Sequence, residues 1–442
     1  MYTTKEIIEI FQKKTIDNKW SFEESKPSER GKWTHSYHRY PAKFIPQIVE
    51  KLLDEYINPN TTNVSVNDPF FGCGTTIVSA ISRGYEANGT DINKIAYLIT
   101  KVKATPIEPN YLKKKIMDFL ATINSLINSQ DTLLTQTNNI KPYIPEKHLE
   151  RIDYWFDEET KTQLGKTLGI ILDEKDEKIQ NFLKVAFSHC LKNCSIWLMD
   201  STKPTRDLKK KIPNPYDILK RHLNKMVKGN DAFYKIIPAE VKTNYSKFLN
   251  IKLADARKQP AKDNSVDITI TSSPYVTSYE YADLHQLSTI WLDLADNLSE
   301  YRKEFIGTAA KQYDDVKLNS EIAKEIVKKL EKKDKKLSQN VEAFYKDMQE
   351  VFKENYRILK PGGRCCYVIG NTKLRKIDIL NAEVFAESLQ NAGFEFDRLI
   401  KRQIHSKLLP QLRDEKTGQF ASNQNADTIA YPVEFIVIGL KR

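Results

Sequence analysis

The chain has 442 residues, 40% of them hydrophobic and 29% charged, and a formal net charge of +11. This length can bury a large core and is expected to hold a catalytic domain and a second lobe, while the positive charge favours a polyanionic partner such as nucleic acid. We expect no bilayer span, because no apolar run approaches ~20 residues, no signal peptide, and a reducing, cytoplasmic setting, because the five cysteines lack paired spacing.

The first predicted elements are two helices joined by a polar stretch. The apolar side of the first helix is formed by Ile7, Ile8, Ile10 and Phe11. After a polar linker comes the segment His35-Ser36-Tyr37-His38-Arg39-Tyr40-Pro41-Ala42-Lys43-Phe44-Ile45-Pro46. It leads into a helix predicted over 47–56.

A glycine loop follows the first predicted strand. The β-branched run 64–66 is typical of a buried strand, and Asp68-Pro69 ends it because proline lacks the amide needed for strand pairing. Gly72 and Gly74 allow a sharp turn close to a ligand, since neither has a Cβ. Helical spacing begins at Thr75. A strand, a glycine turn and a helix N-terminus predict a nucleotide site at the crossover of a doubly wound sheet.

The ligand of this loop is predicted from its acids. The loop matches neither the Gly-x-Gly-x-x-Gly fingerprint nor a P-loop, and the carboxylate of Asp68 would repel a phosphate. A second strand over 85–91 ends in Asp91, 17 positions after Gly74, near the spacing at which an acid binds ribose hydroxyls. The two acids indicate a nucleoside with an amino-acid tail, which describes S-adenosylmethionine. The alternative is a tight strand–helix turn with solvated acids.

Residues 107–250 interrupt the doubly wound pattern with a helical, basic insert, too long for a simple connection. Nine Lys or Arg against two acids lie between 203 and 228. Such a run is either a solvated face or a DNA phosphate contact. The residues predicted for that contact are Lys203, Arg206, Lys209, Lys210 and Lys211.

Two other clusters in the insert favour core packing. His189, Cys190 and Cys194 have helical spacing, but no second Cys or His pair has zinc-ligand spacing, so no metal site is predicted. The run 154–156, Tyr-Trp-Phe, is either an aromatic core cluster or a stacking platform for bases.

The rest of the chain returns to alternating strands and helices. Strands are predicted over 251–256 and over 267–271, the latter breaking into Ser-Ser-Pro-Tyr at 272–275. The final elements are solvent-facing charged helices over 316–359, a turn at 359–363, a strand over 365–369, a helix over 382–392, and strands over 397–403 and 435–440.

Two motifs carry a family resemblance. Residues 68–76 match Asp-Pro-Phe-x-Gly-x-Gly-Thr-Thr completely, and 272–275 match (Ser/Asp/Asn)-Pro-Pro-(Tyr/Phe/Trp) except that Ser273 replaces the first proline. With their flanking strands they cover about half the chain. This closely resembles the S-adenosylmethionine-dependent DNA amino-methyltransferases, of the N4-cytosine and N6-adenine type. It implies an α/β fold, a doubly wound, Rossmann-like seven-stranded methyltransferase sheet with a mainly helical inserted lobe.

The resemblance also implies a division of the chain and a cofactor site. Residues 1–106 would form the cofactor-binding half, 107–250 the target-recognition lobe, and 251–442 the catalytic half with a helical excursion at 302–358. Within the cofactor site, Phe44 would lie against the adenine or the methionine end, and Asp255 would reach the adenine amino group. The implied cofactor-binding residues are Lys43, Phe44, Asp68, Pro69, Phe70, Gly72, Gly74, Thr75, Thr76, Asp91, Ile92, Asp255 and Ala256.

The second motif implies the chemistry. Ser272 Oγ and the Ser273 carbonyl would accept hydrogen bonds from an exocyclic amine, Pro274 would stiffen the loop, and Tyr275 would stack on a base flipped out of duplex DNA. No covalent intermediate is needed, and the C5-cytosine mechanism is excluded because none of the five cysteines follows a proline.

The predicted function is site-specific DNA methylation in restriction–modification or phage defence, with a cognate restriction endonuclease as a candidate partner. Serine at the first motif position favours N4 of cytosine. The alternatives are N6-adenine methylation, RNA guanine-N2 methylation, and a non-catalytic DNA-binding subunit.

Overall fold

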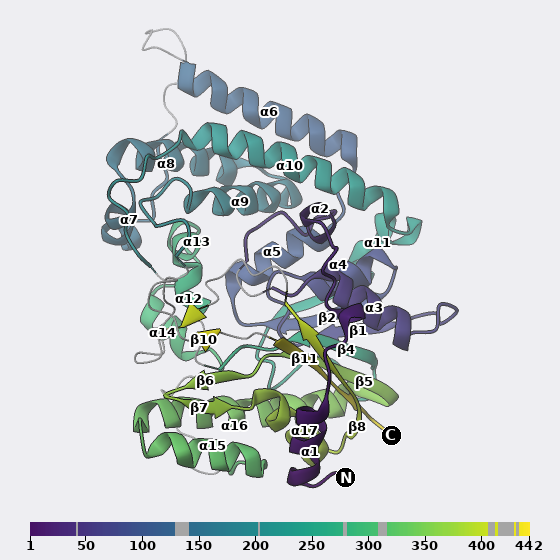
Figure 1. The fold of residues 1–442 in the computed structure, drawn as a ribbon. Helices are drawn as coiled ribbons and strands as arrows, with labels where there is room; N and C mark the ends of the chain where they lie inside the picture. Colours follow the sequence, from purple (N-terminus) through teal and green to yellow (C-terminus); the bar gives the residue numbers. More distant parts are fainter. Residues whose placement is uncertain are drawn as a thin grey trace.

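The computed structural model describes residues 1–40, 43–128, 141–201, 204–276, 281–307, 316–404, 412–413, 428–429 and 433–442. At its centre is a seven-stranded sheet with the order β3-β2-β1-β4-β5-β11-β8 (Figure 1). Its strands are β1 Ser65–Asp68, β2 Glu86–Asp91, β3 Leu249–Leu253, β4 Val266–Ser272, β5 Leu359–Ile369, β8 Glu395–Gln403 and β11 Val433–Leu440. Only β11 runs antiparallel to its neighbours β5 and β8 within this described sheet. The predicted α/β class and seven-stranded sheet are confirmed.

Alternate residues of the central strands enter two different cores. On β5, Cys365 and Tyr367 pack into the core beside α16 (Lys335–Ile358), whereas Cys366 and Val368 pack into the core beside α3 (Pro46–Tyr56) and α4 (Thr75–Ser82). This period of two follows from the strand pleat, and the apolar run reflects burial on both faces. One face is covered by α3 Pro46–Tyr56, α4 Thr75–Ser82, α5 Lys94–Ala104 and α11 Ala239–Phe248, and the other by α1 Thr4–Lys13, α15 Glu321–Glu331, α16 Lys335–Ile358 and α17 Asn381–Asn391.

The charged helices after residue 316 differ from the prediction of a solvent-facing excursion. Their Lys–Glu pairs at helical spacing do form, as in Lys324–Glu321. However, α16 buries an apolar stripe, including Phe344 and Met348, against the sheet. The alternating charges cover only the outer face of these helices, and the inner face forms a layer against the central sheet.

The turn predicted at 359–363 is a bulge inside β5. Pairing with β4 shifts from Val266↔Leu359 to Ile268↔Arg364, which leaves the intervening β5 residues as an insertion. Gly362 has φ +83°, which a residue with a side chain adopts only under strain. The strand therefore begins six residues earlier than predicted.

The insert forms a layer of helices above the sheet, in which α10 lies beside both α6 and α9 (Figure 1). Its core also takes in Ile95 and Ile99 of α5 and Trp291 of α13 (Gln286–Trp291), so the lobe shares a core with a helix that covers the sheet. The lobe contains α6 Pro109–Asn128, η3 Glu146–His148, α7 Leu149–Trp155, α8 Glu158–Asp173, α9 Glu177–Leu191 and α10 Pro215–Ile236.

Several short elements complete the chain: η1 Asn18–Trp20, α2 Pro27–Arg30, α12 Tyr281–Leu284, α13 Gln286–Trp291, α14 Leu298–Lys303, β6 Thr372–Leu374, β7 Ile377–Ile379, β9 Leu412–Arg413 and β10 Thr428–Ile429. The β6–β7 and β9–β10 pairs form two small antiparallel ribbons. Among the helices described, none combines the length and apolarity needed to cross a membrane.

A column of imidazoles joins the lobe to the segment before α3. The rings of His189 and His222 stack with centroids 3.7 Å apart, and His38 lies 5.5 Å from His189 and 6.0 Å from His285. Burial lowers the pKa of His222 and of His285 to about 4 and that of His38 well below its usual value. Neutral imidazoles are therefore part of the folded state.

Lowering the pH should destabilise the folded protein, because the histidines of this column must then be protonated. A histidine with a lowered folded pKa stabilises the native state fully above pH ~6.5, and this stability is lost as the pH falls from ~6.5 toward 4. Each group contributes roughly 1.4 kcal/mol per pH unit, so the free energy of unfolding from urea titrations should fall steeply between pH 7 and pH 5. His222→Gln should reduce that slope, and an equal free energy of unfolding at both pH values would contradict the prediction.

Candidate active site

The glycine loop between β1 and α4 adopts the sharp turn that the sequence predicts. Gly72 has φ +48° and Gly74 has φ +77°, and Gly74 caps α4 in the left-handed conformation. A Cβ on Gly74 would lie 2.8 Å from two side-chain atoms of Thr100. Both the backbone angle and the contact require glycine at position 74.

The loop is held from beneath by side chains of α5. Thr100 Oγ1 donates to the Gly72 carbonyl at 2.8 Å, and Lys103 Nζ donates to the Cys73 carbonyl at 2.9 Å. Lys103 is completely buried, which lowers its pKa to about 8. These bonds fix loop carbonyls that would otherwise be mobile.

Asp68 and Asp91, the two acids predicted to bind the cofactor, have different surroundings. Asp91, at the end of β2, accepts hydrogen bonds from Gly72 N at 2.9 Å and Asn93 N at 2.8 Å, and burial raises its pKa to about 6. Asp68 is 1% exposed and accepts from Thr271 Oγ1 at 2.6 Å, and burial raises its pKa to about 7. Asp68 thus ties the loop to β4, whereas Asp91 faces the pocket.

A pocket with about 790 Å³ of empty space, including its open mouth, lies at the carboxyl ends of β1, β2, β3 and β4. Ten of the predicted cofactor residues line it: Lys43, Phe44, Pro69, Phe70, Gly72, Thr75, Asp91, Ile92, Asp255 and Ala256. The pocket lining does not include Asp68, Gly74 and Thr76, which shape the loop instead.

Further lining residues were not singled out from the sequence: Tyr40, Phe71, Cys73, Asn93, Ala254, Glu304, Phe305 and Ile306. Tyr40 could have been found from its position in the segment that carries Lys43. The wall at 304–306 lies far from both motifs in sequence, and no local pattern marks it.

That wall is connected to Asp255 through an arginine. Arg257 Nε donates to the two Asp255 carboxylate oxygens at 3.0 and 3.1 Å, and Arg257 also pairs with the buried Asp347. Asp347 in turn accepts from Gly307 N at 2.9 Å. The segment after β3 and the segment after α14 are therefore fixed relative to each other.

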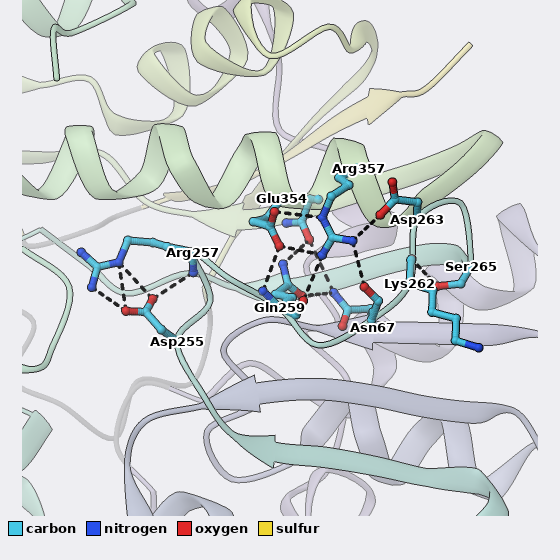
Figure 2. A network of polar contacts seen from close by, with 11 residues as sticks. Asn67, Asp255, Arg257, Gln259, Lys262, Asp263, Ser265, Glu354 and Arg357 are labelled. Atoms are coloured by element: carbon cyan, nitrogen blue, oxygen red, sulfur yellow. Dashed lines mark hydrogen bonds and ion pairs between the residues drawn. The ribbon is translucent and has the colours of Figure 1, made fainter.

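The segment after β3, which carries Asp255, is also attached to β1 by a buried network of amide side chains (Figure 2). Asn67 Nδ2 donates to Gln259 Oε1 at 3.0 Å, and Arg357 Nη2 donates to the Gln259 carbonyl at 2.9 Å. Asn67 immediately precedes Asp68, so this network holds the start of the glycine loop as well.

The second motif begins where β4 ends. Ser272 and Pro274 line the pocket beside the glycine loop. Ser273 is 1% exposed, and its Oγ has no hydrogen-bond partner among the described residues. Tyr275 is half-buried, does not line this pocket, and donates its hydroxyl to Glu434 Oε1 at 2.9 Å.

The basic run lies on the lobe, and its members differ in environment. Arg206, Lys209 and Lys211 are exposed, whereas Lys203 lies outside the described residues. Lys210 Nζ donates to the carbonyls of three residues, at 2.6 to 2.9 Å, and burial lowers its pKa to about 8. The charge of Lys210 therefore stabilises the lobe.

The aromatic residues at 154–156 were predicted to form either a core cluster or a stacking platform, and their burial differs. Trp155 and Phe156 are core residues, as are Cys190 and Cys194. Tyr154 is 43% exposed, and the guanidinium of Arg206 lies 4.3 Å from the centre of its ring. Within the run 154–156, Tyr154 is therefore the exposed residue.

Comparisons with known proteins show similarity to DNA methyltransferases. Residues 2–102 match the DNA methylase family model. The chain is 29% identical over 404 residues to the type II methyltransferase M.MvaI of Kocuria varians, covering 85% of both proteins. It is 23% identical to M.MjaII of Methanocaldococcus jannaschii, covering 61% of this chain and 64% of that protein, and 22% identical to M.BsoBI of Geobacillus stearothermophilus, covering 79% and 77%.

The pocket fits the cofactor of that family. The carboxylates of Asp91 and Asp255 suit hydroxyl and amine groups, and the rings of Phe44 and Phe70 suit adenine. The family match, the relatives and the pocket agree with the two sequence motifs. Together they support membership in the S-adenosylmethionine-dependent DNA amino-methyltransferase family.

Proposed function

We propose that this DNA methyltransferase modifies N4 of cytosine at a specific sequence. The main support is the position of Ser272, which ends β4 and lines the pocket beside the glycine loop. A serine rather than an acid at this first motif position resembles the N4-cytosine enzymes more than most N6-adenine enzymes.

Ser272 and Ser273 would prepare the amine for reaction. The lone pair of an exocyclic amine is delocalised into the base, so the amine is a poor nucleophile. Two acceptors, Ser272 Oγ and the Ser273 carbonyl, would bind its two N–H groups and direct the lone pair out of the base plane. S-adenosylmethionine, which the pocket around Asp91 and Phe44 would hold, would supply the electrophilic methyl group, with S-adenosylhomocysteine as the leaving group and one amine proton released to water. None of these roles needs a covalent enzyme intermediate.

The target base would leave the helix to reach this loop, because the amine is inaccessible inside a duplex. Tyr275 would then stack on the flipped base, a contact worth about 1–3 kcal/mol. The type II relatives support a role in restriction–modification, with a cognate endonuclease as partner.

Nucleoside analysis tests this function directly. The protein is incubated with labelled S-adenosylmethionine and either DNA or RNA, and the nucleosides from each digest are analysed by mass spectrometry. N4-methylcytosine is expected. N6-methyladenine would support the second candidate, and label found only in an RNA substrate would contradict DNA methylation.

We propose that the lobe at 107–250 recognises the target and that Arg206, Lys209 and Lys211 contact phosphate. Replacing Lys209 and Lys211 by alanine should weaken DNA binding, and each lost contact should reduce the slope of log K against log salt by about 0.9. The matched control replaces Lys335 and Lys336, exposed on α16 at the other end of the molecule (Figure 1). Equal slopes for both double variants would place the phosphate contacts elsewhere.

A further inference from the structure

The catalytic loop is attached to a strand that is not its neighbour in the sheet. The Tyr275 hydroxyl donates to Glu434 Oε1 on β11 at 2.9 Å, although β5 lies between β4 and β11. The partly buried Tyr275 side chain also packs against the hydrophobic core that contains residues of α16. The loop is therefore held at two points. Its backbone continues from β4, and the Tyr275 hydroxyl is bonded to Glu434 on β11.

Glu434 is itself fixed by a buried ion pair. It faces Arg402 directly across the β8–β11 ladder, and the two carry a salt bridge with side-chain exposures of 11% and 5%. Arg402 Nε also donates to the Trp20 carbonyl at 2.7 Å. Burial of a lone carboxylate would be costly, so the arginine allows a charged acceptor to lie beneath the loop.

We propose that Glu434 and Arg402 are positioning residues that hold the Tyr275 ring in place before the base arrives. This rests on the proposed role of Tyr275 as the stacking surface. A phenol fixed at its hydroxyl and at its Cα retains little freedom about its two side-chain torsions. The ring is then already ordered when stacking occurs, which lowers the entropic cost of reaching the reactive geometry. A charged acceptor makes this hydrogen bond stronger than a neutral one would.

Two conservative variants and their combination test the hydrogen-bond chain Tyr275–Glu434–Arg402, which we call the relay. Tyr275→Phe keeps the ring and removes the hydroxyl, and Glu434→Gln keeps the size but leaves one acceptor oxygen for both Arg402 and Tyr275. Each should lower the single-turnover rate about tenfold, with S-adenosylmethionine affinity and DNA KM within twofold of wild type. The double variant should be no slower than the slower single variant, because both remove the same contact.

The matched control is Tyr345→Phe on α16, outside the lobe, which removes a buried tyrosine hydroxyl bond to Asn381 Oδ1 at 3.0 Å and should leave the rate unchanged. Hydrogen exchange of the amides of Ser273, Tyr275 and Val276 gives a readout without any reaction: both relay variants should speed it, and Tyr345→Phe should not. Unchanged exchange, or fully additive losses of rate, would overturn the relay. A wild-type protein that methylates no amine would overturn the proposed function, while the exchange result would still decide whether the relay exists.

Discussion

Replacement of Ser272 by alanine is expected to slow methyl transfer by about 10²-fold or more, comparable with removing one preorganised donor from an oxyanion hole. In the proposed mechanism the variant loses one of two acceptors for the amine, while the glycine loop keeps its contacts to α5 and β2. Single-turnover transfer at saturating DNA and S-adenosylmethionine measures this effect.

Ser265→Ala is the matched control, because this serine immediately precedes β4 at its other end and its hydroxyl donates to the Lys262 carbonyl at 2.6 Å. Ser273→Pro should retain activity, since the carbonyl remains and the buried Oγ that it removes has no partner among the described residues. Tyr275→Ala should lose the stacked base. A wild-type rate for Ser272→Ala would mean that other groups orient the amine.

Asp91→Ala is expected to weaken S-adenosylmethionine binding by at least about 1.5 kcal/mol, the scale of a charge-assisted hydrogen bond. Asp91 lines the pocket and accepts a hydrogen bond from Gly72 N. The variant should therefore lose a contact to S-adenosylmethionine and loosen the glycine loop. Its pKa of about 6 adds a pH dependence: affinity should fall as the pH drops below 6, because a protonated carboxyl loses its charge and part of its acceptor capacity. Titration calorimetry between pH 5 and 8 measures both effects.

Asp267→Asn serves as the control for a lost carboxylate. This residue pairs with Lys360 near the amino end of β4, away from the pocket, and should leave cofactor affinity unchanged. A folded Asp91→Ala protein that binds S-adenosylmethionine as tightly as wild type would exclude Asp91 from the cofactor site.

Much of the fold could be predicted because its signals are local. The β-branched run before Asp68, the two glycines and the helical spacing from Thr75 correctly predicted β1, the turn and α4. The strand predicted over 85–91 likewise placed Asp91 at the end of β2. Parallel strands bring their carboxyl ends to one edge of a sheet, so acids predicted at strand ends converge.

Other features depend on which face of an element is buried. Lys and Glu alternate along α16, and this pattern indicated a solvated helix, although its Phe344 face covers the sheet. Lys210 lies in the most basic run of the insert, but nearby carbonyls of the lobe bind its ammonium. A count of charges along the chain does not distinguish these environments.

The sequence by itself therefore determined the fold class, the family, the cofactor and both motif loops, because each is encoded in a short stretch of chain. Only the tertiary structure decided which residues support those loops: Lys103 beneath the glycine turn, Asp347 behind Asp255, and Glu434 at Tyr275. These partners lie from 30 to 159 positions away from the residues they hold. Their hydrogen bonds arise only when sheet order and helix packing bring distant segments together, and no local pattern records such contacts.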